Sequence, residues 1–332
     1  MMNRTSLDAL TDQLISYVRR KPGQYYSWKS LTSKLNAAQT DIGAALAVAA
    51  DWEYKLRVNR GKGVKFVAPP DLLTSTEIRH GLKTRTVGRT IHAFRSVKST
   101  NDLAAKLAED GAPEGVIVTA EEQTKGRGRL GRSWFSPPRT GIYVSIILRP
   151  SVAPENAPGL SVMTAVALAD TLTKWRPGLV QIKWPNDVWI NGRKTAGILT
   201  ELSAERTRIN HVVVGVGINV NHQASEFPDN LRAMATSIRR ELRHKVDRLE
   251  LLREFLRHFE KEYTSYLKCR LKKSLPRVRN YSALLGREVT LQSGQTRRTG
   301  VVKDIDVNGA LLLKTAEGVE TITAGEVTVV RG

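Results

Sequence analysis

The stretch Gln123–Pro137 reads QTKGRGRLGRSWFSP and carries the densest chemical pattern in the sequence. Between Gly126 and Arg132, three glycines alternate with three arginines. Glycine lets the backbone approach a ligand and present its N–H groups, and guanidinium groups bind carboxylate or phosphate through paired hydrogen bonds. Because the buried-looking run Ile142–Leu148 follows closely, we expect an anchored anion-binding loop rather than a flexible, RNA-binding Gly-Arg segment. Trp134, at the end of the loop, fits either stacking on a purine or filling the core.

A second motif, Lys183–Asp187, reads KWPND and follows a strand-like run. Proline removes a hydrogen bond from a strand interior, so Pro185 predicts a bend that exposes its polar neighbours. A carboxylate beside cations suits Mg²⁺ shared with substrate phosphates, although Asp187 also fits an ordinary turn. The hairpin signal Asn191-Gly192 returns Lys194 toward Asp187, and a lysine entering an apolar strand needs an anion unless it stays solvated.

Two further clusters place polar groups at the ends of expected elements. Ser99, Thr100 and Asn101 precede a helical pattern over 102–109, where they either cap the helix or bind a polar ligand. Asn219 follows two glycines at the end of an apolar run. Its amide suits either a nucleotide contact or a cap of the strand end.

The zones around these motifs predict at least two kinds of domain. From about residue 83 to 268, strand-like runs alternate with helical patterns, which predicts an α/β or α+β domain with a mixed sheet. From about residue 281, short runs are separated by closely spaced turns such as Asn308-Gly309 and Glu317-Gly318. Turns at this spacing predict a small all-β barrel.

Residues 1–68 follow another order of elements. Three helical patterns precede two alternating runs, which lie between Tyr54 and Val67 around a basic glycine turn. This is the order of a winged helix-turn-helix, a fold that places a helix in the DNA major groove. The expected DNA contacts are Gln39 and Thr40 at the start of helix 41–51, and Arg57, Arg60, Lys62 and Lys65 on phosphates.

Helix 41–51 itself has no Arg, Lys, Asn or Gln that could read a base edge. The alternative for this zone is therefore a protein-contact or regulatory role. After it, Ala68–Asp71 reads as a linker and 72–82 as a bridging helix.

Composition narrows the class of protein. The 332 residues suit about two or three folded domains, and 52 basic against 32 acidic residues give a net charge of +20, which favours an anionic partner. No apolar stretch approaches the roughly 20 residues needed to span a membrane. The single cysteine, Cys269, and an acid at Asp8, where a signal peptide needs its apolar core, favour the cytoplasm.

Taken in order, the motifs resemble those of the biotin protein ligase family. The match comprises Ser99-Thr100-Asn101, Gly126–Trp134, Lys183–Asp187, Lys194–Ile198 and Gly215–Asn219, in the family's order and approximate spacing. With the zones on either side, the resemblance covers nearly the whole chain. It is nearest to bifunctional members that are both ligase and biotin operon repressor.

The resemblance implies a multidomain α+β fold. Residues 1–68 would form the winged helix-turn-helix domain, and 69–82 the linker and bridging helix. Residues 83–270 would form a mixed-sheet α/β catalytic domain that resembles class II synthetase-like biotin ligases. Residues 281–332 would form an SH3-like small β-barrel.

The resemblance also implies a two-step reaction that uses ATP, Mg²⁺ and biotin. The carboxylate of biotin attacks the α-phosphate of ATP, giving biotinyl-5′-AMP and pyrophosphate. A lysine on a biotin carboxyl carrier protein domain then takes the acyl group. Operator DNA and a ligand-linked homodimer are further implied partners.

Residue by residue, the resemblance implies three sets of site residues. The biotin contacts would be Ser99, Thr100, Asn101, Gln123, Gly126, Arg127, Gly128, Arg129 and Lys194. The ATP or adenylate contacts would be Arg127, Arg129, Arg132, Trp134 and Asn219. The catalytic groups would be Lys194, Arg129, Asp187 and Lys183. Asp187 is also the expected Mg²⁺ ligand. Lys183 would either contact a phosphate or support neighbouring residues.

Two other functions fit parts of the pattern. One is a regulator that binds an acyl-adenylate without transferring it, against which the presence of Lys194, Asp187 and the arginine loop argues. The other is a lipoate or octanoate ligase, which is not expected to carry Gly-Arg-Gly-Arg together with Lys-Trp-Pro-Asn-Asp. Arg331, near the C-terminus, has no clear register with the family pattern and is not assigned to the site.

Overall fold

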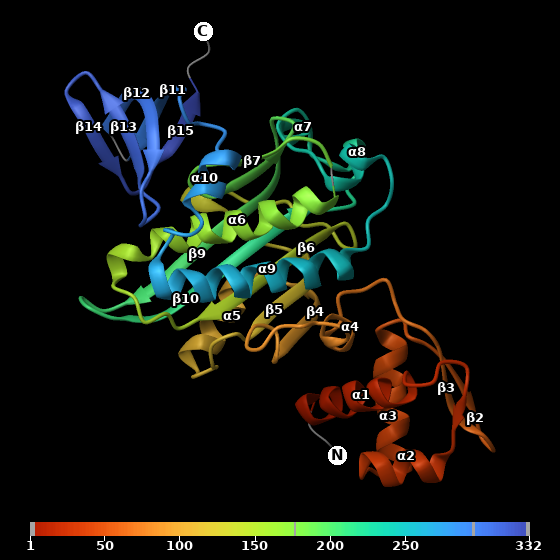
Figure 1. The fold of residues 1–332 in the computed structure, drawn as a ribbon. Helices are drawn as coiled ribbons and strands as arrows, with labels where there is room; N and C mark the ends of the chain where they lie inside the picture. Colours follow the sequence, from red (N-terminus) through yellow and green to blue (C-terminus); the bar gives the residue numbers. More distant parts are fainter. Residues whose placement is uncertain (1–3, 176, 294–295, 330–332) are drawn as a thin grey trace. The chain divides into compact units, whose positions relative to one another are not determined.

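The computed structural model describes residues 4–175, 177–293 and 296–329. The chain divides into two compact units, Met1–His80 and Gly81–Gly332 (Figure 1). Within the described ranges, no helix combines the length and the apolarity needed to cross a bilayer. Arg331 lies outside the described residues.

The first unit consists of helices around a small sheet. Its helices are α1 (Arg4–Val18), α2 (Trp28–Leu35), α3 (Gln39–Asp51) and α4 (Ser75–Arg79). Its strands are β1 (Tyr25–Tyr26), β2 (Lys55–Asn59) and β3 (Gly63–Ala68), in the order β1-β3-β2.

Helical spacing of apolar residues builds the core of this unit. Leu14 and Val18 from α1 are buried against Leu31 from α2 and Ile42 from α3. The hydroxyl of Ser27 caps α2 by accepting a hydrogen bond from the Ser30 backbone N–H. Helix α3 begins at Gln39, two residues earlier than predicted, so the candidate base-reading residues lie in its first turn.

Helix α4 is part of the first unit. It is shorter than the predicted helix over 72–82, and the hydroxyl of Thr74 caps it by accepting from the Glu77 backbone N–H. The guanidinium of Arg19, directly after α1, donates to both carboxylate oxygens of the buried Glu77, at 2.9 and 2.7 Å. This paired contact holds α4 against α1, because a buried carboxylate requires a partner.

The second unit contains the mixed sheet that the sequence predicts. The strand order is β4-β5-β6-β10-β9-β8-β7, with β4 and β5 parallel and the other neighbours antiparallel. The strands are β4 (Ile91–Val97), β5 (Ile117–Gln123), β6 (Gly141–Leu148), β7 (Val180–Lys183), β8 (Asp187–Ile190), β9 (Arg193–Ala204) and β10 (Ile209–Asn219).

Helices cover this sheet. The long helices α6 (Pro158–Trp175) and α9 (Arg248–Cys269) run side by side across the sheet (Figure 1). Helix α5 (Thr100–Glu109) buries Ala104 against Val213 of β10. Side chains alternate between the faces of a strand, so Gly215, Gly217 and Asn219 share the face of Val213. Shorter helices are α7 (Asp229–Arg232), α8 (Ile238–Leu242) and α10 (Leu275–Tyr281), with 3-10 turns at Arg129–Gly131, Pro154–Asn156 and Ala224–Glu226.

The C-terminal part forms an antiparallel sheet, as its closely spaced turns predict. Its strands are β11 (Glu288–Ser293), β12 (Thr296–Ile305), β13 (Leu311–Thr315), β14 (Gly318–Ile322) and β15 (Glu326–Val329), in the order β14-β13-β12-β11-β15. The indole N–H of Trp184 donates to the Gly309 carbonyl at 2.8 Å and links this sheet to the KWPND motif. This hydrogen bond joins the turn between β12 and β13 to the KWPND motif within the second unit.

Candidate active site

A cavity of about 580 Å³ lies over the face of the central sheet that carries Gly215 and Gly217. Its walls come from the start of α5, the end of β5, the strands β7 to β10 and the residues around β15. The segment Gly126–Trp134, called the glycine loop below, forms another wall. Of the residues predicted to bind biotin or ATP or to act in catalysis, all except Gly126 line the cavity: Ser99, Thr100, Asn101, Gln123, Arg127, Gly128, Arg129, Arg132, Trp134, Lys183, Asp187, Lys194 and Asn219.

The start of α5 forms a polar corner of the cavity. Ser99 is the N-cap of the helix, and its hydroxyl accepts from the Asp102 backbone N–H. The side-chain oxygen of Gln123 accepts from both the backbone N–H and the hydroxyl of Thr100, at 2.9 and 3.0 Å. This arrangement fixes hydroxyl and amide groups at a helix N-terminus, where polar parts of a ligand are favoured.

Asn101 is held behind this corner. Its side-chain oxygen accepts from the Ser145 hydroxyl at 2.6 Å, and its amide donates to the Glu201 carboxylate at 2.7 Å. A Cβ atom at Gly215 would lie 2.1 Å from the Asn101 oxygen, so only glycine allows this approach. Asn101 is 4% exposed, which makes it a rigid part of the cavity wall.

The glycine loop is folded back on itself. The Trp134 backbone N–H donates to the Gly126 carbonyl at 2.8 Å, and the Gly128 N–H donates to the Arg132 carbonyl at 2.7 Å. Gly126 begins the loop, and a Cβ added to it would lie 2.5 Å from the Trp134 carbonyl oxygen. The loop is therefore anchored, as the sequence predicts.

Two glycines leave the space that the indole of Trp134 occupies. Gly197 of β9 and Gly217 of β10 are directly opposite each other in the sheet. A Cβ at Gly217 would lie 2.3 Å from the indole nitrogen, and one at Gly197 would lie 3.0 Å from the ring. The indole N–H is buried and has no hydrogen-bond partner among the described residues. The half-buried Trp134 thus presents its ring to the cavity from a fixed position.

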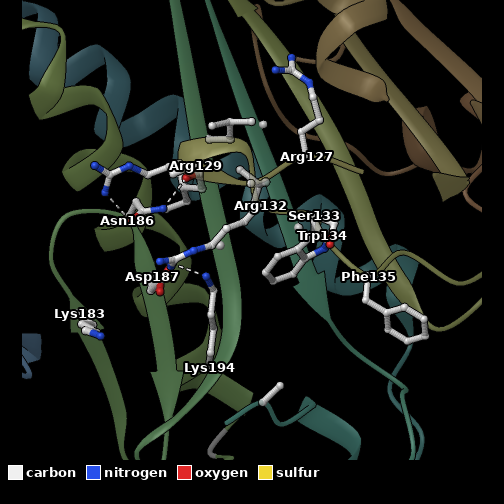
Figure 2. A pocket seen from close by; sticks show the side chains of 18 of the residues that line it. Arg127, Arg129, Arg132, Ser133, Trp134, Phe135, Lys183, Asn186, Asp187 and Lys194 are labelled. Carbon is white, nitrogen blue, oxygen red and sulfur yellow. Dashed lines mark hydrogen bonds and ion pairs between the residues drawn. The ribbon is translucent and has the colours of Figure 1, made fainter. Parts of the chain in front are cut away.

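The two hairpins of β7, β8 and β9 bring the predicted charged residues together. Lys183 on β7 is opposite Asp187 on β8 in the strand register. The turn between them contains a cis peptide bond between Trp184 and Pro185. The Lys194 amine lies 2.8 Å from Oδ1 of Asp187. Figure 2 shows the side chains of Lys194 and Asp187 turned toward each other below the glycine loop. The hairpin brings Lys194 next to Asp187, as the Asn191-Gly192 signal predicts.

Two cations in the cavity lack a carboxylate within ion-pair distance among the described residues. Burial lowers the pKa of Lys183, and the neighbouring Lys194 and Arg132 lower it further, while Asp187 and Glu326 act in the opposite direction. Burial also lowers the pKa of Arg129, whose guanidinium donates to the Asn186 side-chain oxygen at 3.0 Å. Such partly desolvated cations favour an incoming anion.

The C-terminal sheet contributes to the same cavity. The Arg132 guanidinium pairs with the Glu326 carboxylate at 2.5 Å, and Glu326 lines the cavity with its neighbour Gly325. Sequence reasoning did not identify Glu326. The one signal that the sequence offered for Glu326 was its position directly after the Ala324-Gly325 turn, where a strand is expected to begin.

Other lining or neighbouring residues were also missed. Asp102 and Glu201 pair with Arg127, although both lie next to motifs that the sequence analysis used. An acid on the otherwise apolar strand 194–202 was the available signal for Glu201. No pattern marked the apolar wall formed by Phe227, Leu231, Met234 and Ala235.

The candidate DNA contacts lie on the first unit. Gln39, Thr40, Arg57, Arg60 and Lys62 are exposed and Lys65 is half-buried. The indole N–H of Trp28 donates to the Asn59 and Arg60 carbonyls and so fixes the tip of the β2–β3 hairpin.

Comparison with known proteins agrees with this geometry. Residues 93–219 match the Biotin/lipoate A/B protein ligase family, and residues 284–330 match the Biotin protein ligase C terminal domain. The bifunctional ligase/repressor BirA of Bacillus subtilis is 34% identical over 318 residues, which cover 96% of this chain and 98% of the relative. The protein of the same name from Escherichia coli is 29% identical and covers 92% of this chain and 93% of the relative.

A solved structure extends the comparison to three dimensions. The biotin protein ligase from Aquifex aeolicus, in complex with biotin and ATP, superimposes with a TM-score of 0.64 and 30% sequence identity. The match covers 74% of this chain and all of that one. With its matching motifs, its cavity and its relatives over nearly the full length, the chain belongs to the biotin protein ligase family.

Proposed function

We propose that the chain is a biotin–protein ligase that joins biotin to a lysine of a biotin carboxyl carrier protein domain through biotinyl-5′-AMP. The observation that carries this function is the cavity, where the five motifs meet around Arg129 and Lys183, two cations that have no carboxylate partner within the described part of the chain. The names of the relatives and the bound biotin and ATP of the Aquifex aeolicus structure support the same substrates.

The first step brings two anions together. Arg129 and Lys194 hold the biotin carboxylate against the α-phosphate of ATP, and their positive charge stabilises the developing negative charge at the phosphoryl oxygens. Lys183 faces the departing phosphates. The biotin contacts are Ser99, Thr100, Asn101, Gln123, Gly126, Arg127, Gly128, Arg129 and Lys194.

The nucleotide lies beside the indole of Trp134. Trp134 stacks on the adenine from the position that Gly197 and Gly217 give it, and Asn219 binds the nucleotide from the end of β10. Arg129 and Arg132 complete the adenylate contacts with their side chains, and Arg127 does so with its backbone. The rim of loop and apolar side chains then excludes water from the mixed anhydride.

Mg²⁺ fits this site as an ion shared with the substrate. The described residues contain no cluster of three or more potential metal ligands, and Mg²⁺ commonly binds through phosphates with one or two carboxylates. Asp187 is the carboxylate that would hold it, beside Lys183 and Lys194. When bound, Mg²⁺ would neutralise charge on the phosphates.

The second step transfers the acyl group to the carrier lysine. The lysine amine attacks the carbonyl carbon of the adenylate, and AMP leaves. Lys194 stabilises the carbonyl oxygen, and Asp187 orients the attacking amine. A regulator without transfer activity would require none of this arrangement.

One experiment separates the candidate functions. The protein is incubated with ATP, labelled biotin and a biotin carboxyl carrier domain, and in parallel with labelled lipoate. We expect label from biotin on the carrier lysine and none from lipoate. Label from lipoate alone would identify a lipoate ligase. Adenylate without carrier label would identify the regulator.

The first unit serves transcriptional repression in this proposal. Residues 1–68 act as a winged helix-turn-helix, 69–82 as a linker and bridging segment, 83–270 as the catalytic domain, and 281–332 as an SH3-like barrel. Two protomers, joined when the adenylate is bound, present two such domains to operator DNA. The exposed Gln39 and Thr40 and the basic hairpin support this function.

A further inference from the structure

The guanidinium of Arg127 lies between two carboxylates. One of its nitrogens is 2.6 Å from Oδ1 of Asp102 and 2.8 Å from Oε2 of Glu201. Partial burial lowers the pKa of Arg127, but the hydrogen bonds and charges of Glu201 and Asp102 outweigh it, and the pKa is raised. The charge of this arginine is therefore already neutralised by the protein.

Arg127 differs in this respect from Arg129 and Lys183, two other cations of the cavity. With two negative charges beside one positive charge, its surroundings repel a further carboxylate or phosphate. Arg129 and Lys183 have no carboxylate at ion-pair distance among the described residues. Figure 2 shows the Arg127 guanidinium directed away from Arg129, Arg132 and Lys194. The Arg127 side chain is thus poorly suited to bind the substrate anions, although Arg127 is one of the residues that line the cavity.

Glu201 connects this arginine to the polar corner of the cavity. The carboxylate that pairs with Arg127 also accepts from the Asn101 amide at 2.7 Å. The Ser145 hydroxyl lies within hydrogen-bond distance of the Asn101 side-chain oxygen, at 2.6 Å, and of the Thr100 hydroxyl, at 2.8 Å. One side of the glycine loop is therefore connected to β9 through Glu201, and to α5 through Asp102 and through the hydrogen bond between Asn101 and Glu201.

The other side of the loop is fastened to the same corner. Gln123, which accepts from Thr100, donates its amide to the Ser136 hydroxyl at 3.0 Å, and that hydroxyl donates to the Trp134 carbonyl at 3.0 Å. The loop that carries Arg129 is held at both ends by groups that contact the substrate corner.

We propose that Glu201, assisted by Asp102, is a positioning residue that latches the glycine loop over the cavity through Arg127. This inference rests on the proposed ligase function and adds a second role to the loop. While the latch is closed, the adenylate is retained until the carrier lysine arrives. When the latch opens, the loop lifts and the adenylate is released into water.

The test uses the full chain with Glu201→Gln, which removes the charge but keeps the shape of the side chain. Asp102→Asn is the second variant. The matched control is Glu320→Gln, because Glu320 and Arg298 form a similarly exposed ion pair on the C-terminal sheet, away from the cavity. The measurements are the rate of trypsin cleavage after Lys125, Arg127, Arg129 and Arg132, the rate of adenylate release, and the kcat and KM of pyrophosphate formation.

We expect both latch variants to be cleaved in the loop about threefold to tenfold faster than wild type, the effect of one partly exposed charged contact. Adenylate release rises by a similar factor, while kcat for pyrophosphate formation changes by less than about twofold. The difference from wild type shrinks at high salt, since exposed ion pairs are screened. Arg127→Lys retains the adenylate better than Arg127→Gln.

Loop cleavage and adenylate release equal to wild type in both variants would overturn the latch. Cleavage spread over the second unit in Glu201→Gln would indicate general destabilisation, and wild-type cleavage of the loop in Asp102→Asn would then also overturn it. If wild type forms no biotinyl-5′-AMP, the proposed ligase function fails. The cleavage rates still decide whether Glu201 holds the loop.

Discussion

The amine of Lys194 lies 2.8 Å from the Oδ1 atom of Asp187, at the point where β8 and β9 run beside the cavity. The side chain of Lys194 is 34% exposed and that of Asp187 is 18% exposed, so the pair is open to the cavity on one side. An incoming phosphate or carboxylate can take the place of Asp187 as the partner of the amine. Asp187 then becomes free to bind a metal ion or orient the attacking lysine.

This relationship leads to a prediction for Lys194→Ala. The variant should fold like wild type and lose about 10²–10³-fold in the rate of adenylate formation, because a cation aimed at developing charge contributes on that scale. Biotin-dependent pyrophosphate release measures the rate. Lys174→Ala is the control, because Lys174 forms an ion pair of the same length with Glu254 on the surface. A rate near wild type in Lys194→Ala would remove this role.

Most of the fold was predictable from local patterns. The run Ile142–Leu148 reappears as β6 almost to the residue, and the helical patterns expected between the strand-like runs include α6. Their burial follows from apolar periodicity alone. The predicted bridging helix over 72–82 is longer than the observed α4, because Thr74 caps the start of α4 and His80 is its C-cap. Such an end depends on capping and on packing against α1, which periodicity does not report.

The candidate site was predictable where a motif concentrates unusual residue types. Lys183, Asp187 and Lys194 came from two short hairpins, which bring sequence neighbours together. Glu201 and Glu326 reach the site from separate elements, through contacts with Arg127 and Arg132. A single sequence does not identify the partner of an ion pair over such separations, because any acid satisfies an arginine equally well.

The second prediction concerns Arg129→Gly. Its guanidinium donates to Asn186 and so joins the loop to the KWPND motif. We expect the variant to form biotinyl-5′-AMP but release it early, so that free adenylate labels lysines on bystander proteins. Mass spectrometry of a mixture with an unrelated protein measures this labelling. Bystander labelling no greater than with wild type would mean that the loop closes without Arg129.

The third prediction concerns the seat of Trp134. In Gly217→Ala the new methyl group would lie 2.3 Å from the indole nitrogen and displace the ring. Stacking of a base on an aromatic ring contributes about 1–3 kcal/mol, so the KM for ATP should rise by about tenfold with little change in the KM for biotin. Gly43→Ala in the first unit is the control, since an added Cβ there meets nothing within 4 Å. An equal rise in both KM values would point to a general distortion of the site.

The fourth prediction concerns pH. Burial, assisted by the nearby charge of Arg248, lowers the pKa of His222 to about 4 in the folded chain, from 6.5. Below about pH 6.5 the unfolded chain binds a proton that the folded chain refuses, so stability falls as the pH drops toward 4 and is unaffected above 6.5. The loss attributable to His222 is on the order of 3 kcal/mol.

Denaturant unfolding of wild type and His222→Gln at pH 7 and pH 4.5 measures this effect. The free energy of unfolding of wild type should fall more between the two pH values than that of the variant. The comparison isolates His222 from the other histidines with lowered pKa values, His92, His211 and His258, because they are present in both proteins. Equal losses in the two proteins would refute the buried, neutral state of His222.

The fifth prediction concerns DNA. The exposed basic residues of the β2–β3 hairpin suit phosphates, and log affinity should fall with log salt by about 0.9 for each phosphate neutralised. Replacing Arg60 and Lys62 by alanine should reduce that slope, whereas the same change at the exposed Lys272 and Lys273 of the second unit should not. Titrations of a labelled duplex at several salt concentrations measure the slope.

Specificity should be weak even where affinity is measurable. After Gln39 and Thr40, the exposed positions of α3 include Gly43, Ala44 and Ala47, which offer no hydrogen bonds to base edges. We expect an operator-like duplex to be preferred over a scrambled one by less than about 10³-fold, with or without biotinyl-5′-AMP. Strong discrimination that depends on the adenylate would assign base reading to Gln39, Thr40 and the hairpin. If no DNA binds even at low salt, the basic residues of the first unit do not serve as phosphate contacts. The first unit would then have a structural or regulatory role.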